Sequence, residues 1–320
     1  MLGKIIIRLS AVVVLSVIFA GCGPEAGTAR SRLDSKADLS LTFSAGDSTM
    51  YKVAVKGIKD FKFEQPSLGK LKDEQTGSAI ELKFLQEIES VDNNGNAVAR
   101  ITVKGLKYLV KNKSGVVLDY DSESGKKHYL SKLLGKSYKI KLNRNGQVQV
   151  IDAGAIRRIS TEKIVKNFLS EPRIVRRHEI LSLPKSGQSI LRKGGNWSRI
   201  KASPPGLLSP KTFEKVYTLR DVSKNNIAIV KMEAVPTTKI PEDAPTGDQG
   251  MGVFAKMFDS EENFTGQMVL DLNTGKVQKY NEELAASYVA AESPREQVKG
   301  KGPDILTMGF THAVSLEMIE

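Results

Sequence analysis

Large apolar residues alternate with polar ones, with a period of two, over most of the chain. Between residues 79 and 89 every second position is apolar, with charged residues between (Ile80, Leu82, Phe84 and Ile88 form the apolar face). The segment 93–96, Asn-Asn-Gly-Asn, then supplies residues that tolerate positive φ. Alternation resumes on the far side of this turn at Ala97, Ala99, Ile101 and Val103. This pattern predicts an antiparallel hairpin.

The same pattern recurs along the chain and predicts a mainly β fold built of antiparallel hairpins. Further hairpins are expected over 138–150, 213–235 and 264–280, and a last strand over 305–318. An early strand is expected through Tyr51, Val53 and Val55, followed by a polar loop from Gln65 to Gly77. A short helix is predicted over 129–134. The fold class is thus β-rich with a minor α component.

The middle of the chain has helical rather than strand periodicity. Ile164, Val165, Phe168 and Leu169 share one helical face, which Pro172 is expected to end. The region is also basic, and its seven cations are Arg157, Arg158, Lys163, Lys166, Arg173, Arg176 and Arg177. Such a helix can rest on an anionic membrane surface. The alternative, which we favour, is that its apolar face packs on a sheet while its charges are solvated.

A second helical signal lies inside a Pro-, Gly- and acid-rich insertion, residues 236–263. Val253, Phe254, Met257 and Phe258 form an i, i+1, i+4, i+5 apolar stripe. A short helix there could act as a lid over a ligand-binding cavity. The alternative, which we favour, is that it caps the open end of a sheet.

The N-terminal segment has the layout of a secretory signal peptide. Lys4 and Arg8 precede an apolar run from Leu9 to Ala20, which is too short for a stable membrane span. Ala20-Gly21-Cys22 then looks like a lipobox, in which the cysteine thiol is lipidated. Cys22 is the one cysteine among 320 residues, so a disulfide within the chain is impossible. The same tripeptide could also be cut after Cys22 by an ordinary signal peptidase.

The composition gives the chain a moderate positive charge. The changes in residue pattern along the chain predict its division into five parts. The net charge is +12, and removal of residues 1–21, which hold Lys4 and Arg8 and no acid, leaves +10. This excess favours anionic partners such as envelope polymers or lipid headgroups, and a secreted chain is not expected to bind nucleic acid. The expected parts are a signal peptide (1–21), a flexible tether (22–37), a first β half (38–155), a linking helical region (156–180) and a second β half (181–320).

The two β halves share short sequence matches. Val91-Asp92-Asn93-Asn94 parallels Val222-Ser223-Lys224-Asn225, and Leu118-Asp119-Tyr120 parallels Leu270-Asp271-Leu272. A duplication would give two similar sheets joined by the helical region. Degenerate matches of this kind also arise by chance among unrelated hairpins, so both interpretations stay open.

The lipobox followed by repeated hairpin segments resembles uncharacterised bacterial envelope lipoproteins. That resemblance implies acyl chains on Cys22. It also implies a place in the cell envelope, at the outer membrane in a Gram-negative cell because Gly23 rather than aspartate follows the cysteine. It implies no activity.

Motifs for catalysis or metal binding are not legible in the sequence. His128, His178 and His312 are far apart and lack metal-ligand spacing. Five Ser-x-x-Lys matches are what chance gives in a lysine-rich chain. We therefore expect a non-enzymatic binding or scaffolding lipoprotein without a cofactor. The alternative is a periplasmic carrier or sensor of a lipid-like ligand, which would need a closed apolar cavity.

Overall fold

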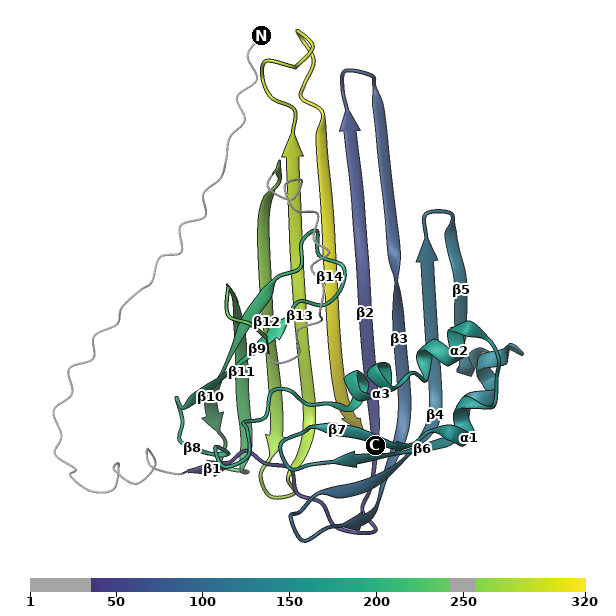
Figure 1. Ribbon diagram of the computed structural model, residues 1–320, viewed down its shortest axis with the longest axis vertical. Coiled ribbons are helices and arrows are strands. Elements are labelled where there is room, and N and C mark those ends of the chain that lie inside the picture. Colours follow the sequence, from purple (N-terminus) through teal and green to yellow (C-terminus); the bar gives the residue numbers. More distant parts are fainter. Residues whose placement is uncertain (1–35, 242–256) are drawn as a thin grey trace, which may run out of the picture. The chain divides into compact units, whose positions relative to one another are not determined.

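A computed structural model describes residues 36–241 and 257–320, and over these residues the protein is mainly antiparallel β (Figure 1). One 12-stranded sheet has the order β7-β6-β4-β3-β2-β14-β13-β12-β11-β10-β9, with β5 paired to the far end of β4. A small sheet pairs β1 with β8. The β-rich, hairpin-built fold expected from the alternation is confirmed.

The bounds of the first seven strands are β1 Ala37–Asp38, β2 Ser48–Gln65, β3 Lys70–Val91, β4 Ala97–Asn112, β5 Gly115–Asp121, β6 Ser137–Leu142 and β7 Val148–Asp152. Those of the others are β8 Ile190–Leu191, β9 Asn196–Ala202, β10 Thr212–Val222, β11 Ile227–Thr237, β12 Asp259–Asp271, β13 Lys276–Ala291 and β14 Ile305–Ile319. The helices are η1 Ser122–Ser124, η2 Tyr129–Leu133, α1 Gly154–Arg157, α2 Lys163–Phe168 and α3 Glu171–His178.

One face of the large sheet, here called the inner face, packs against the three α-helices. Phe84 on β3 meets the ring of His178 edge-on, and Tyr108 on β4 lies beside Phe168 of α2. The apolar positions of the predicted hairpin point to this inner face, where Ile80, Leu82 and Phe84 are all buried. On β4 a bulge opposite Lys83 shifts the register by one residue. Leu106 and Tyr108 therefore point inward as Ala97 and Val103 do, although their spacing breaks the period of two.

The helical region is divided into three short helices rather than one. α2 ends at Phe168, and the prediction that Pro172 ends the helix is wrong. Pro172 instead lies in the first turn of α3, where a proline loses no intrahelical hydrogen bond and its fixed φ suits the helix. Val165, Phe168 and Ile174 are buried against the sheet. The favoured interpretation, an apolar face on the sheet, is confirmed for these residues.

The polar loop expected between Gln65 and Gly77 is also wrong. β2 and β3 continue to a turn of four residues, with the Leu68 amide donating to Gln65 O. These outer halves read as loop because their side chains are mostly polar or half-exposed on both faces. Pairing of β2 with β3 as far as Gln65 and Lys70, and of β14 with β2 as far as Glu64, holds them in the sheet instead. Tertiary pairing overrides a weak local signal here.

The turn match between the two β halves has a local explanation. The 92–96 turn has the Asp92 amide donating to Asn96 O and the Gly95 amide to Asp92 O; the 223–227 turn repeats this pattern. The β6–β7 turn has it as well, between Asn143, Gly146 and Gln147, although it belongs to neither matched segment. Common hairpin chemistry therefore accounts for this match. Duplication of the halves stays a prediction, and both halves share one sheet.

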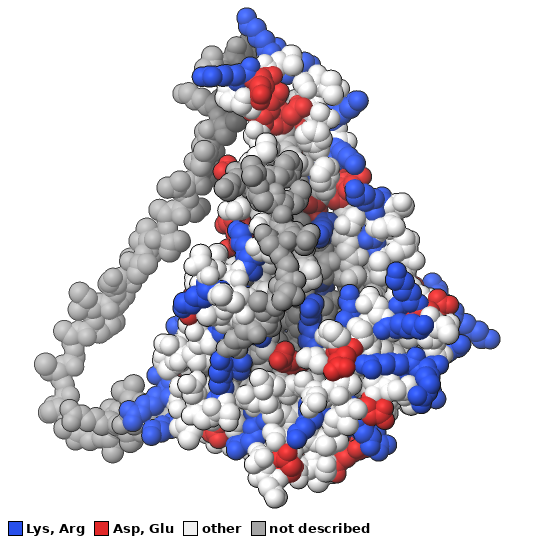
Figure 2. All heavy atoms as spheres, viewed as in Figure 1, with Lys and Arg blue, Asp and Glu red and all other residues white. Residues whose placement is uncertain are grey.

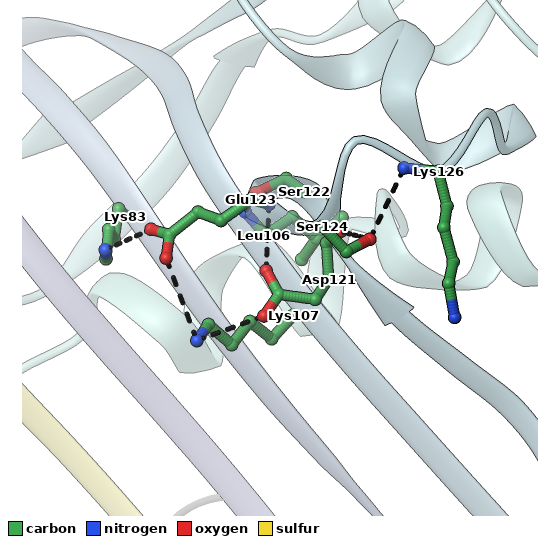
Figure 3. Close-up of polar contacts among 8 residues, drawn as sticks. All are labelled: Lys83, Leu106, Lys107, Asp121, Ser122, Glu123, Ser124 and Lys126. Atoms are coloured by element: carbon green, nitrogen blue, oxygen red, sulfur yellow. Dashed lines mark hydrogen bonds and ion pairs between the residues drawn. The ribbon is translucent and has the colours of Figure 1, made fainter.

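A network of exposed charges closes the end of β5 against the outer face of β3 and β4 (Figure 3). Glu123 Oε1 lies 2.5 Å from Lys83 Nζ, and Lys107 Nζ lies 3.2 Å from Asp121 Oδ2. The Leu106 amide donates to Ser122 Oγ at 2.9 Å. Because every charged member is at least a third exposed, each pair contributes little to stability. The network positions η1 and is not a candidate site.

Candidate functional site

The inner face carries one buried ion pair in a wall that is otherwise largely apolar. Lys215 Nζ on β10 lies 2.5 Å from Glu282 Oε2 on β13, and both side chains are almost completely buried. Tyr217 donates its hydroxyl hydrogen to Glu282 Oε1 at 3.2 Å. The Lys215 ammonium also lies 4.3 Å from the centre of the Phe264 ring. The pair is thus supported by a phenol and an aromatic face, which offsets part of its desolvation.

Strand alternation places these charges inside. Lys215 stands between the buried Phe213 and Tyr217, and Glu282 stands between the buried Tyr280 and Leu284. β12 gives Glu282 room through Gly266, which is paired with it across the strands. A Cβ on Gly266 would come within 2.7 Å of the Asn281 carbonyl oxygen and 3.0 Å of Glu282 Cγ, so a larger residue would force the neighbouring strand and the Glu282 side chain to shift.

A cavity of about 650 Å³ lies over this ion pair. Its walls come from α3 and the residues after it, from the segment 201–210, and from β10, β12, β13 and β14. Its apolar lining includes Val175, Leu207, Phe264 and Val314, and its charged lining includes Arg176, Glu179, Lys201, Lys215 and Glu282. A few polar groups in a mostly apolar pocket of this size are typical of sites for small organic ligands.

His312 on β14 also lines the cavity, and burial is the main reason that its pKa falls to about 4. The charges of Arg176 and Lys215 lower it further. The pKa of Tyr280 and that of Tyr217 are raised well above 10.0, first by burial and next by the charge of Glu282. At neutral pH His312 is therefore uncharged and both phenols keep their protons, so all three offer hydrogen-bonding groups without net charge.

A second cavity of about 310 Å³ continues along the inner face toward the β2–β3 turn. Phe61, Tyr288, Met308 and Phe310 line it, with Lys59 and Lys72 among its charged residues. Gly206 and Leu207 border both cavities, so the segment 203–210 separates them. Gly206 has φ +136°, and a Cβ there would approach the Phe310 ring to 2.3 Å. Glycine at this position is what allows the segment to lie so close to the sheet.

The basic residues of the helical region do not form one surface. The exposed members are Arg158, Lys163, Lys166, Arg173 and Arg176. Arg157 is half-buried and donates to Leu169 O. Arg177 is buried, donates to Phe168 O at 2.8 Å and stacks on the Phe168 ring, so it faces the core instead of solvent. Contact of this region with an anionic surface stays a prediction for the five exposed cations.

The apolar stripe of the insertion is described only in part. Phe258, just before β12, is buried, and Met257 is exposed. Val253 and Phe254 lie outside the described residues, as does Cys22. The lid and the lipidation site therefore stay predictions.

Sequence reasoning missed Lys215, Glu282 and His312. A signal existed, since each is a polar residue at an inner position of an otherwise apolar alternation, such as Phe213-x-Lys215-x-Tyr217. What it could not give is the pairing of β10 with β13 across two intervening strands. Among the described residues no group of three or more His, Cys, Asp or Glu is placed to hold a metal ion. No helix in the described ranges is both long and apolar enough to cross a membrane.

Comparison with known proteins does not assign the chain to a family. No protein-family model matches the chain, and no curated protein matches it. A lipovitellin structure, reported for its lipid–protein interactions, has a TM-score of 0.45 at 12% identity and covers 87% of this chain. The match spans 25% of the lipovitellin chain. OpdQ of Pseudomonas aeruginosa has a TM-score of 0.16 at 8% identity, covering 84% of this chain and 98% of its own. At these scores neither likeness bears on function.

Proposed function

We propose that the protein binds an amphipathic, lipid-like molecule on the inner face of its large sheet, and that it does so as a lipid-anchored protein of the cell envelope. The observation that supports this most is the cavity of about 650 Å³ over the Lys215–Glu282 pair. Of the two functions expected from the sequence, scaffolding needs no cavity, whereas a carrier or sensor does. The cavity therefore favours the carrier or sensor, but the expected closed apolar cavity is not what is observed, because charged residues such as Arg176, Lys215 and Glu282 also line it.

The lining divides the ligand into two chemical parts. The apolar walls, Phe264 and Val314 in the first cavity and Phe61, Met308 and Phe310 in the second, suit a hydrocarbon chain. Lys215, Glu282 and the uncharged His312 lie together in the first cavity and suit a hydrogen-bonding headgroup. Burial of apolar ligand surface supplies affinity at about 25 cal/mol per Å², and the polar cluster supplies orientation.

A cavity-filling substitution tests this proposal directly. Val314 lines the cavity, and its neighbour Ala313 lies on the opposite face of the same strand. Val314→Phe should abolish saturable binding of a fluorescent fatty-acid analogue by occupying the space for its chain. The matched control Ala313→Phe should leave probe binding within about twofold of the wild type, because one strand position moves the ring to the outer face.

The measurement is a titration with the fluorescent fatty-acid analogue together with a thermal melt of each variant. Folded Val314→Phe that still binds the probe as the wild type does would contradict the proposal, as would a wild type that shows no saturable binding. A more conservative variant, Val314→Leu, covers the case in which phenylalanine prevents folding. It should weaken binding in proportion to the space it takes.

A further inference from the structure

Exposed large apolar side chains gather at one end of the large sheet. Leu68 and Leu71 are 60% and 65% exposed at the β2–β3 turn. Val298, in the β13–β14 loop, is 53% exposed. Scattered exposed leucines are normal on protein surfaces, whereas several in neighbouring loops mark an interaction site.

Antiparallel order explains why these loops share an end. β2 and β13 run in one direction and β3 and β14 return, so the β2–β3 and β13–β14 connections lie at the same end, whereas the β4–β5 turn stops short of them (Figure 1). We call residues 65–71 and 292–304 the hairpin tips. The two are joined directly: Gln65 and Ser67 donate to the Asp304 carboxylate, at 3.1 and 3.0 Å. The tips therefore form a defined surface.

The charges on the hairpin tips are arranged unequally. The carboxylates are occupied by their own neighbourhood: Glu64 pairs with Lys62, Asp304 accepts from Gln65, and Glu292 accepts from the Asp304 amide. Within the described ranges no ion pair or hydrogen bond engages the side chains of Lys70, Arg295, Lys299 and Lys301, all of them exposed. Figure 2 shows Lys and Arg side chains projecting at this end. The surface thus presents leucine and valine side chains among cations that have no ion-pair or hydrogen-bond partner within the described ranges.

We propose that the hairpin tips dock on the surface of an anionic lipid bilayer. Leu68, Leu71 and Val298 would enter the headgroup region, while the four cations meet lipid phosphates. Burial of the apolar side chains and attraction of the cations to anionic headgroups act together, which suits reversible binding to a bilayer surface. A protein partner would be expected to meet aromatic anchors, which these exposed apolar positions lack.

The location of the second cavity agrees with this surface. Lys72, near the start of β3 and next to the tip at residues 65–71, lines that cavity, as does Lys113 in the β4–β5 turn. A bilayer held at the tips would therefore lie beside the cavity and could exchange a lipid-like molecule with it. That exchange rests on the proposed function, but docking itself does not require an occupied cavity.

Site-specific labelling tests docking apart from any contribution of the N-terminal segment. Because Cys22 is the one cysteine of the chain, full-length Cys22→Ser is a cysteine-free background. Leu68→Cys and Val298→Cys place a polarity-sensitive fluorophore on two tips. Ile151→Cys is the matched control, 50% exposed on β7 away from the tips, and Lys163→Cys reports on the basic helices. Vesicles of phosphatidylglycerol with phosphatidylcholine are compared with phosphatidylcholine alone.

The expected result is a blue shift of emission at positions 68 and 298 with anionic vesicles, which 0.5 M salt reverses, and no shift at 151. Lys299→Glu combined with Lys301→Glu should reduce the vesicle affinity at least tenfold, while binding of the fatty-acid analogue in the cavity stays unchanged. A shift at 163 without one at 68 would overturn the proposal and place docking on the helices. Equal shifts at 68 and 151, or none at 68, would overturn it as well. If the protein docks on anionic vesicles but does not bind the fatty-acid analogue, only the proposed ligand-binding function is refuted.

Discussion

At the scale of single residues, Lys215 and Glu282 form an ion pair that is almost completely buried. Both side chains are less than a tenth exposed, and the pair makes two further contacts, one with the Tyr217 hydroxyl and one with the Phe264 ring. Buried pairs of this type often contribute no more than well-packed apolar residues would. Stability alone is therefore a weak reason for the pair, and a role in orienting a ligand is a stronger one.

This setting predicts an asymmetry between single and double substitutions. Lys215→Met should lower the free energy of unfolding by about 3–5 kcal/mol, because Glu282 is left as an unpaired buried charge. Lys215→Met with Glu282→Leu should recover most of that loss. As a control, Lys52→Met removes a partner of the half-exposed Lys52–Glu317 pair and should cost less than about 1 kcal/mol. Urea unfolding measures all three, and equal costs for Lys215→Met and Lys52→Met would contradict the assignment.

His178 predicts a pH dependence of stability. Burial, and next the charge of Arg177, lower its pKa from 6.5 to about 3, and it shares a 2.6 Å hydrogen bond with the Tyr138 hydroxyl. The unfolded chain binds the proton more readily than the folded protein does, so stability is complete above pH 6.5. It falls as the pH drops from 6.5 toward 3. His312, with its pKa lowered to about 4, adds to the same trend.

The measurement is the free energy of unfolding at several pH values from 7 to 4.5. Each of the two histidines should contribute at most about 1.4 kcal/mol per pH unit to the slope of the free energy of unfolding against pH. This is the change for each pH unit when the unfolded state binds one proton more than the folded state. His178→Asn should reduce the slope by one proton's share and lower stability at pH 7 through the loss of packing against Phe84. A wild type whose stability is constant from pH 7 to 4.5 would refute the linkage.

At the scale of elements, alternation predicted strands wherever one face is buried. Ile80 to Phe84 on β3 and Phe213 to Leu219 on β10 belong to this group, because their inner side chains are buried and their outer ones partly exposed. The outer halves of β2 and β3 escaped prediction because neither face is fully buried there, so the sequence carries no alternation of apolar and polar residues. Strand register is likewise invisible in a sequence of this kind, since pairing of β14 with β2 joins residues that are between 305 − 64 = 241 and 319 − 50 = 269 positions apart.

The candidate site was out of reach of the sequence for the same reason. Lys215, Glu282 and His312 come from β10, β13 and β14, which only the strand order of the sheet brings to one cavity. The helical region shows the other limit: its apolar face was predicted, but the sequence did not separate Arg177, which is buried, from the exposed Arg176. Helical spacing places two such neighbours about 100° apart, so one of them can face the sheet.

At the scale of the whole molecule, the described chain begins at the end of the sheet opposite the hairpin tips. Leu41 bonds to Arg144 O in the β6–β7 turn, and Thr42 bonds to Gly275 O in the β12–β13 turn. β2 spans about 60 Å from this end to the tips, at ~3.3 Å for each of its 18 residues. The proposed acyl anchor depends on burial of hydrocarbon, whereas the proposed docking of the tips depends on charge, so the two contacts have separate dependences on salt.

That separation predicts the behaviour of Cys22→Ser in fractionated cells. Without acyl chains the protein should leave the membrane fraction in 0.5 M salt, since lipid anchoring does not depend on salt but docking of charged tips does. At low salt a residual fraction should stay bound, and Lys299→Glu with Lys301→Glu in the same chain should release it. The wild type should stay in the membrane fraction under both conditions. An intact mass that corresponds to an unmodified Gly23 N-terminus in the wild type would refute the anchor, and Cys22→Ser would then change nothing.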